Sequence, residues 1–215
     1  MNTMLLARQL ACVRGERQLF RETSFGLAAG ELLRVEGHNG VGKTSLLRML
    51  AGLSTAAAGD ILWQDTPIAR LGGAYRRQMC YLGHLNAIKE ELTPLENLLT
   101  SAGLEEVDSQ HSLSSSAAEA ALSQLGLLSR ADLACKYLSQ GQKRRVALSR
   151  LAHEKRPLWI LDEPFVALDT AAVAWLAECI GRHLQCGGLV VLTTHQAVAI
   201  PGVSSQVLKL GGASC

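Results

Sequence analysis

Three short segments of this chain carry residue types that can act on phosphate groups. One is a pair of consecutive carboxylates, Asp162 and Glu163, and another places a hydroxyl beside a glycine at Ser139 and Gly141. The third is a glycine-rich loop that ends in lysine and threonine, and it reads Gly37-His38-Asn39-Gly40-Val41-Gly42-Lys43-Thr44. Basic, hydroxyl and acidic side chains in this combination indicate binding of a nucleoside triphosphate with Mg²⁺.

The surroundings of the glycine-rich loop fit a phosphate-binding loop. An apolar strand at residues 32–36 precedes it, and a helical pattern follows over residues 45–50. Glycines let backbone N–H groups turn toward the phosphates, and the helix N-terminus adds positive potential. We expect Lys43 to bridge the β- and γ-phosphates and the Thr44 hydroxyl to hold Mg²⁺. The predicted nucleotide-binding set is Gly37, His38, Asn39, Gly40, Val41, Gly42, Lys43, Thr44 and Ser45.

The glycine-rich loop alone would also fit a kinase, a GTPase or a motor protein. A GTPase needs an Asn-Lys-x-Asp segment that reads the guanine base. No asparagine in this chain is followed by lysine, which excludes that class.

The two carboxylates follow an apolar strand predicted at residues 158–161. Ligands of open α/β sheets bind outside the carboxyl ends of the strands, where Asp162 and Glu163 would lie. Asp162 is suited to hold Mg²⁺ through water, and Glu163 to orient or deprotonate the attacking water. Consecutive acids after a strand could instead be solvated turn residues, but the phosphate loop in the same chain favours the functional interpretation.

Ser139 and Gln142 have the spacing of a capping box, which predicts that a helix begins there and runs to Leu151. A hydroxyl beside the free N–H groups of a helix start can bind an anion. For Ser139 alone, an ordinary helix cap explains the pattern equally well.

Strand-like segments alternate with helical ones, which predicts an α/β fold with a largely parallel sheet. The strands are expected at residues 32–36, 158–161 and 189–193, and shorter polar strands at 5–13, 19–27 and 61–63 would form an antiparallel flap. The length of 215 residues predicts a single domain over residues 1–215. Within it we expect a core with the flap at 1–80 and 155–215, and a helical subdomain at 81–154.

Two helix starts are marked by local residue chemistry. Thr93, Pro94 and Glu96 form a capping box with proline at the first helical position, so a helix is expected to begin at Pro94. Ser116 and Glu119 predict a second start, with a helix that ends near Gly126. The serine-rich stretch between them, residues 101–115, is predicted to be a surface loop.

The composition excludes several classes of protein. A net charge of +2, from 21 basic and 19 acidic residues, gives no broad surface for nucleic acid or anionic lipid. The six cysteines include no Cys-x-x-Cys pair and the N-terminus has no secretory apolar core, which predicts reduced thiols in a cytosolic protein. Residues 187–208 lack charge but contain His195, Pro201 and Gly202, so a bilayer span is not expected.

The phosphate loop, the Leu-Ser-Gln-Gly-Gln segment at 138–142 and Leu161-Asp162-Glu163-Pro164 together resemble the ATP-binding subunits of ABC transporters. The resemblance implies a P-loop NTPase (RecA-like) core with the antiparallel flap and an inserted α-helical subdomain. It also implies that ATP and Mg²⁺ are bound, and that two copies close head to tail around two ATP molecules. In that dimer Ser139, Gln140, Gly141 and Gln142 would contact the ATP held by the other copy.

The same resemblance assigns four further residues. Asp169 matches the loop that links the two sites of the dimer, and His195 matches the switch histidine that contacts the γ-phosphate. Arg14 stands where the family commonly stacks an aromatic ring on adenine, and a guanidinium can stack on a base. His84 replaces the family's glutamine, and its ring can still hydrogen-bond water near Mg²⁺.

Four parts of the chain are similar to the ATP-binding subunit of the bacterial cytochrome c maturation system: residues 81–84 with 88–98, 144–151, 157–165 and 193–196. This implies a peripheral ATPase on the cytoplasmic face of the inner membrane that drives haem export or the release of haem from a carrier. Its partners would be integral-membrane transporter subunits, and no nucleic acid is expected. Residues 84–98 are the candidate contact with these subunits, and a solvated helix start is the alternative interpretation of that segment. Two alternatives stay open: a soluble ABC ATPase of cofactor assembly, and the ATPase subunit of another small-substrate exporter.

Overall fold

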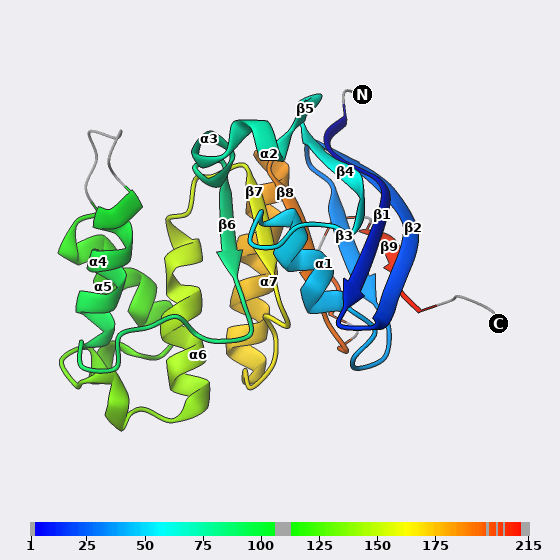
Figure 1. The fold of residues 1–215 in the computed structure, drawn as a ribbon. Helices are drawn as coiled ribbons and strands as arrows, with labels where there is room; N and C mark the ends of the chain where they lie inside the picture. Colours follow the sequence, from blue (N-terminus) through cyan, green and yellow to red (C-terminus); the bar gives the residue numbers. More distant parts are fainter. Residues whose placement is uncertain (1–2, 106–112, 197, 201, 204, 212–215) are drawn as a thin grey trace. The chain divides into compact units, whose positions relative to one another are not determined.

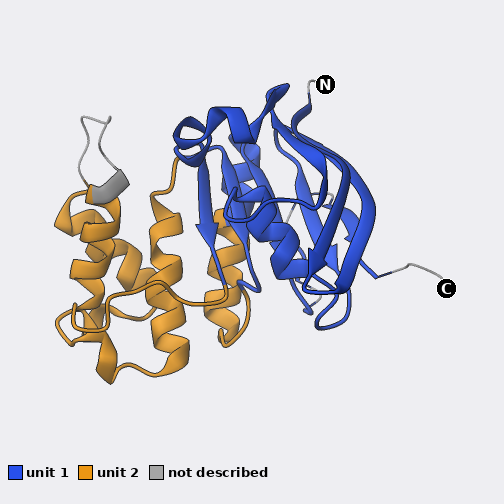
Figure 2. Ribbon diagram, viewed as in Figure 1, with its two compact units in different colours: residues 1–83, 156–164, 180–215 blue, residues 84–155, 165–179 orange. Residues whose placement is uncertain are grey.

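The computed structural model describes residues 3–105, 113–196, 198–200, 202–203 and 205–211 (Figure 1). They fall into two compact units (Figure 2). The core unit comprises residues 1–83, 156–164 and 180–215, and the helical unit comprises residues 84–155 and 165–179. Among the described helices, none has both the length and the apolar character needed to cross a bilayer. The domain and subdomain bounds expected from the sequence stay predictions.

The core unit is built on a parallel sheet with the strand order β6-β7-β8-β3-β9. Every residue of β7 (Leu158–Leu161) and β8 (Leu189–Thr193) is buried, because strands inside a parallel sheet are covered on both faces. The strand β3 (Leu32–Glu36) lies beside β8, and the edges are β6 (Met79–Leu82) and β9 (Ser205–Lys209). The three apolar strands expected from the sequence are confirmed with the same bounds.

A second sheet of the core unit is antiparallel, with the order β2-β1-β4-β5. It consists of β1 (Thr3–Arg14), β2 (Arg17–Ala28), β4 (Ala58–Trp63) and the short β5 (Thr66–Pro67). In β1 the buried residues Leu5, Ala7, Leu10 and Cys12 belong to the apolar core, and the exposed pair Arg8 and Gln9 lies between Ala7 and Leu10. The predicted flap is confirmed, and its strands are longer than expected.

Three helices of the core unit lie in the sequence between the phosphate loop and β6. α1 (Lys43–Leu50) buries Leu46, Leu47 and Leu50 in the core. α2 (Ile68–Leu71) and α3 (Gly73–Arg76) are single turns. Tyr75 of α3 donates its hydroxyl hydrogen to the Leu50 carbonyl at 2.6 Å, and this bond anchors α3 to the end of α1.

The helical unit contains α4 (Pro94–Glu105), α5 (Ser115–Gln124), α6 (Gln140–Ser149) and the first part of α7 (Thr170–Gln185). Short 3-10 helices lie at Leu128–Arg130, Cys135–Tyr137 and Arg150–Ala152. The predicted start of α4 is confirmed, since Glu96 N–H donates to Thr93 Oγ1 and Thr93 N–H to Glu96 Oε2. The capping box of Ser139 and Gln142 is also present.

Two sequence predictions about this unit are wrong. α5 begins at Ser115, because the Ser114 hydroxyl caps it by accepting from the Ala117 N–H at 3.2 Å, whereas we expected the start at Ser116. The predicted loop at 101–115 is helical up to residue 105, where α4 continues; residues 106–112 lie outside the described part. The expected end of α5 near Gly126 is confirmed by the φ of +65° at that glycine.

Gly59 in β4 lies where β4 approaches β1 too closely for a side chain to fit. It has a φ of +85°, and a Cβ atom there would overlap the backbone carbonyls of Arg8 and Gln9, where the pairing of β1 and β4 changes register. We expect Gly59→Ala to lower the free energy of unfolding by about 3 kcal/mol, from left-handed strain plus the steric overlap. Denaturant unfolding measures this.

Gly52→Ala is the matched control. Gly52 also has a positive φ, +64°, but a Cβ atom there would meet nothing within 4 Å. Gly52→Ala should lower the free energy of unfolding only by the strain of the left-handed conformation, about 1 kcal/mol. Equal losses in the two variants would contradict the steric account of Gly59.

Candidate nucleotide-hydrolysis site

The glycine-rich loop leads directly into α1. Gly42 caps the helix in the left-handed conformation, with φ of +110°, and the Leu46 N–H donates to its carbonyl. A Cβ atom at Gly42 would lie 3.0 to 3.1 Å from Phe20 and Leu19 of β2. Glycine at this position therefore lets the loop pass close under the antiparallel sheet and leaves the first N–H groups of α1 free for an anion.

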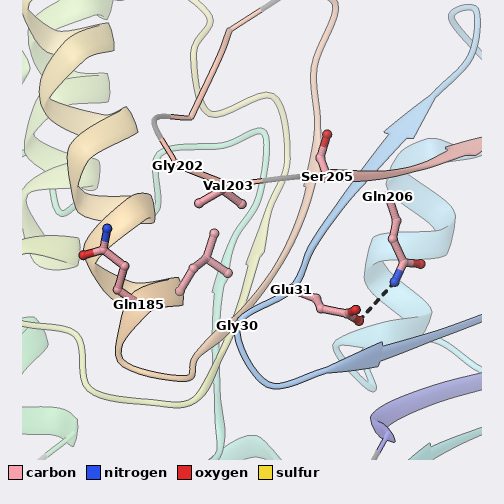
Figure 3. Close-up of a pocket in the computed structure, with 8 residues that line it drawn as sticks. Gly30, Glu31, Gln185, Gly202, Val203, Ser205 and Gln206 are labelled. Atoms are coloured by element: carbon pink, nitrogen blue, oxygen red, sulfur yellow. Dashed lines mark hydrogen bonds between the residues drawn. The ribbon is translucent and has the colours of Figure 1, made fainter. Parts of the chain in front are cut away.

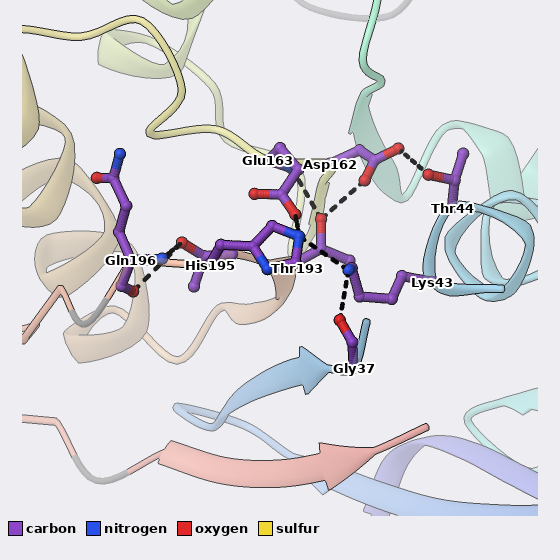
Figure 4. A network of polar contacts seen from close by, with 9 residues as sticks. Gly37, Lys43, Thr44, Asp162, Glu163, Thr193, His195 and Gln196 are labelled. Carbon is purple, nitrogen blue, oxygen red and sulfur yellow. Dashed lines mark hydrogen bonds and ion pairs between the residues drawn. The ribbon is translucent and has the colours of Figure 1, made fainter. Parts of the chain in front are cut away.

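Lys43 is held inside this loop. Lys43 is only 8% exposed, and its Nζ donates a hydrogen bond to the Gly37 carbonyl at 2.7 Å. Nζ also lies 3.0 Å from Nε2 of His195 (Figure 4). The ammonium group is thus fixed at the mouth of the loop, where it can pair with a phosphate.

Asp162 is the most deeply buried carboxylate of the site, at 1% exposure. Thr44 Oγ1 donates to its Oδ2 at 2.8 Å, and Thr193 Oγ1 donates to its Oδ1 at 2.7 Å. Two hydroxyl donors supply hydrogen bonds to a carboxylate that is removed from water. Burial, followed by the charge of Asp162, raises the pKa of Tyr81 on the adjacent strand β6.

Glu163 and His195 lie side by side at the ends of β7 and β8. Oε1 of Glu163 is 3.3 Å from Nε2 of His195 (Figure 4). Glu163 has a φ of +47°, which is unusual for a residue with a side chain, and its N–H donates to Thr193 Oγ1 at 2.8 Å. Thr193 therefore holds the backbone of Glu163 in a conformation that places the carboxylate next to His195.

The oxygen donors of Thr44 and Asp162 fit Mg²⁺. They are a hydroxyl and a carboxylate 2.8 Å apart at the end of the phosphate loop, and hard oxygen ligands of this kind are what Mg²⁺ prefers. A site with one or two protein ligands is typical of Mg²⁺ that is bound together with substrate phosphates.

The structure thus brings together five of the predicted residues, Lys43, Thr44, Asp162, Glu163 and His195, within the core unit. Arg14 belongs to the same unit and is exposed at the end of β1, opposite Arg17 in the hairpin. The roles of these residues in ATP chemistry stay predictions.

The other phosphate-loop residues, 37–42 and 45, also belong to the core unit, whereas the predicted dimer-contact residues and His84 belong to the helical unit. Ser139 is the exposed cap of α6, followed by Gln140, Gly141 and Gln142 in its first turn. Asp169 accepts from the Ala172 N–H at 2.9 Å at the start of α7, and Arg145 donates to it at 3.3 Å. His84 is exposed at the beginning of the unit.

Thr193 is the functional residue that the sequence analysis missed. It connects Asp162 to the backbone of Glu163, yet it lies far from both in the sequence. A polar pair, Thr193-Thr194, at the carboxyl end of an apolar strand was the available signal.

A separate pocket of the core unit has a volume of about 310 Å³ (Figure 3). It is lined by Gly30, Glu31, Leu184, Gln185, Gly202, Val203, Ser205 and Gln206. The Glu31 carboxylate accepts hydrogen bonds from the Ala28 N–H and the Gln206 side chain, so it closes the turn between β2 and β3 and fastens β9 to it. These contacts explain Glu31 as a structural residue.

Comparison with known proteins places this geometry in a family. Residues 20–166 match the family model described as ABC transporter. The chain belongs to the ABC transporter family. Its fold resembles a solved ATP-binding subunit of an ABC transporter, with a TM-score of 0.81 and 26% identity, over 97% of this chain and 86% of that one.

Among curated ABC proteins, the chain is similar to cytochrome c biogenesis ATP-binding export proteins named CcmA. It is 62% identical to that of Dechloromonas aromatica, over 97% of this chain and all of the relative. It is 50% identical to that of Nitrosospira multiformis, over 94% of this chain and 96% of the relative. These findings confirm the P-loop NTPase fold, an ATP-binding subunit most like CcmA, and its activity as an ATPase.

We expect Thr193→Val to disturb both carboxylates of the site. The variant keeps the shape of the side chain but leaves the buried Asp162 without one of its hydroxyl donors, which costs about 1 to 3 kcal/mol of unfolding free energy. It also releases the backbone of Glu163, so kcat for ATP should fall. Thermal unfolding and steady-state phosphate release measure the two effects.

Thr193→Ser keeps the hydroxyl and serves as the control. It should retain most of the kcat and lose stability only through the missing methyl group. A Thr193→Val protein with unchanged kcat would show that Thr193 does not position Glu163.

Proposed function

We propose that the chain is the ATP-hydrolysing subunit of a membrane complex for cytochrome c maturation, and that its ATP cycle drives haem export or the release of haem from a carrier. The observation that carries this proposal is the 62% identity, over the full length of the relative, to a cytochrome c biogenesis ATP-binding export protein. The cluster of Lys43, Thr44, Asp162, Glu163 and His195 supports the catalytic part.

ATP would bind through the phosphate loop. Lys43 exchanges its bond to the Gly37 carbonyl for the β- and γ-phosphate oxygens, and the N–H groups of residues 40–45 turn toward the same phosphates. Thr44 and Asp162 would hold Mg²⁺, which neutralises phosphate charge when it is bound. Arg14, exposed on the antiparallel sheet, can stack on the adenine base.

Glu163 and His195 would carry the hydrolysis step. The Glu163 carboxylate is 15% exposed, so it is partly shielded but still reachable by a water molecule, which it orients or deprotonates for attack on the γ-phosphate. His195, 3.3 Å from Glu163, contacts the γ-phosphate from the same side. His84 would hydrogen-bond the water near Mg²⁺ in place of the family's glutamine.

The second half of each site would come from another copy of the chain. The cap of α6, formed by Ser139 to Gln142, offers a hydroxyl and N–H groups to the γ-phosphate bound by the partner copy. Asp169, at the start of α7, would link the two sites. ATP binding then closes the dimer, and hydrolysis to ADP and phosphate reopens it.

The dimer would dock on integral-membrane subunits at the cytoplasmic face of the inner membrane. Residues 84–98 are the proposed contact, and they include Leu85, which is 82% exposed. No nucleic acid is expected as a partner, because the net charge is only +2.

Glu163→Gln is the variant that tests the catalytic assignment. It keeps the size of the side chain but removes the base, so ATP should still bind while kcat falls by about a hundredfold or more. Closed dimers should accumulate with ATP, as measured by light scattering, and phosphate release gives the turnover. Unchanged turnover would remove Glu163 from its assigned role.

Purification of the native chain from membranes tests which membrane process the proposed ATP cycle drives. We expect integral-membrane subunits to co-purify with it, and cells with Glu163→Gln to contain much less covalently haem-bearing cytochrome c on haem-stained gels. A protein that is recovered without any membrane partner, with normal cytochrome c levels in the variant, would favour a soluble ATPase of cofactor assembly. A membrane partner with normal cytochrome c levels would favour another small-substrate exporter.

A further inference from the structure

Within the helical unit, residues 89–92 are bonded to the segment that leads into the cap of α6. The Cys135 N–H donates to the Leu92 carbonyl at 2.9 Å, and the Lys136 N–H donates to the Glu90 carbonyl at 2.8 Å. Cys135–Tyr137 is a 3-10 helix, and only Leu138 separates it from Ser139. These two main-chain bonds bring the loop next to the segment before the cap, where side chains can tie the two together.

Asn97 fixes the shape of this loop from inside. Its Oδ1 accepts from the Lys89 N–H at 2.8 Å, and its Nδ2 donates to the Lys89 carbonyl at 2.9 Å. Nδ2 also lies 3.4 Å from Sγ of Cys135, which is fully buried. One amide thus connects the loop, the first turn of α4 and the segment before Ser139.

An ion pair joins the same loop to α6 itself. Nζ of Lys143 is 2.6 Å from Oε1 of Glu90, and the Lys143 side chain is only 10% exposed. Lys143 follows Ser139 by one helical turn, and its N–H donates to the Ser139 carbonyl at 2.8 Å. Removal of the Glu90 charge would take this partner from a shielded ammonium group, which costs more than the loss of a fully exposed ion pair.

We infer that Glu90 and Asn97 are positioning residues that couple the loop at residues 84–93 to the phosphate-contacting cap at Ser139. The inference rests on the proposed function, in which this cap engages the ATP of a second copy. When Ser139 shifts to meet the phosphate, the bonds of Lys143 to Glu90, of Cys135 to Leu92 and of Asn97 to Cys135 move the loop with it.

The coupling also acts in the reverse direction. If ATP changes the affinity of the loop for a binding partner by some factor, that partner must change the affinity of the dimer for ATP by the same factor. Leu85 is 82% exposed on this loop and takes no part in the bonds described above, so a label there can report on the movement of the loop.

A fluorescent reporter on the loop tests the coupling. The parent protein carries Glu163→Gln, so that ATP traps the dimer, together with Cys186→Ser and Cys215→Ser. Bimane is attached to the thiol of Leu85→Cys; the other cysteines, Cys12, Cys80, Cys135 and Cys179, are buried. Light scattering records dimer formation, and bimane emission records the loop, each with ATP and with ADP.

In the parent protein we expect ATP, and not ADP, to change the emission as the dimer forms. Glu90→Gln should still dimerise with ATP, but the emission change should fall about fivefold, in keeping with the coupling of residues in direct contact. Lys143→Gln should give the same loss, and the double variant should lose no more than either single one. Asn97→Ala is a second, independent disruption with the same expected loss.

Glu119→Gln is the matched control, since it removes one negative charge from an exposed residue of α5 in the same unit. It should keep the full emission change. A full change in both Glu90→Gln and Asn97→Ala, or a dimer that forms without any change in the parent, would overturn the inference and leave the proposed function intact. A parent protein that stays monomeric with ATP would overturn the proposed function, and the inference with it.

Discussion

The site depends on one buried carboxylate. Asp162 is almost completely removed from water, and an ionised group in that position is stable only when it is hydrogen-bonded. Two hydroxyls satisfy it, one from Thr44 at the start of α1 and one from Thr193 at the end of β8. These bonds fix the phosphate loop and the two central strands to each other at the place where the parallel sheet ends.

The position of Glu163 depends on the same hydrogen bonds. Because the Thr193 hydroxyl donates its hydrogen to Asp162, its oxygen can accept from the Glu163 N–H. This bond stabilises the positive φ of +47° at Glu163, which is unfavourable for a residue with a side chain. The strained backbone turns Glu163 toward His195, which in turn approaches Lys43. A structural requirement of the buried aspartate therefore also sets the geometry of the groups proposed to act on water and phosphate.

The sequence predicted those features that local chemistry determines. The phosphate loop, the strand before Asp162 and the caps of α4 and α6 each depend on residues within a few positions of one another. Thr193 could not be found in that way, because its contact arises from the pairing of β7 with β8, where Leu161 lies opposite Leu192. The start of α5 was misplaced because Ser114, Ser115 and Ser116 are chemically equal as caps, and only the fold selects among them.

The two units carry different parts of the proposed cycle, and each holds its part by a different kind of contact. In the core unit, Lys43 donates to the Gly37 carbonyl and lies beside His195, and in the proposed cycle a phosphate group would take the place of these contacts. In the helical unit, Ser139 is exposed and its own bonds are confined to its helix turn, so it is free to meet a phosphate from another molecule. In the proposed dimer, each copy would therefore hold one ATP through its core unit and close over the partner's ATP through its helical unit.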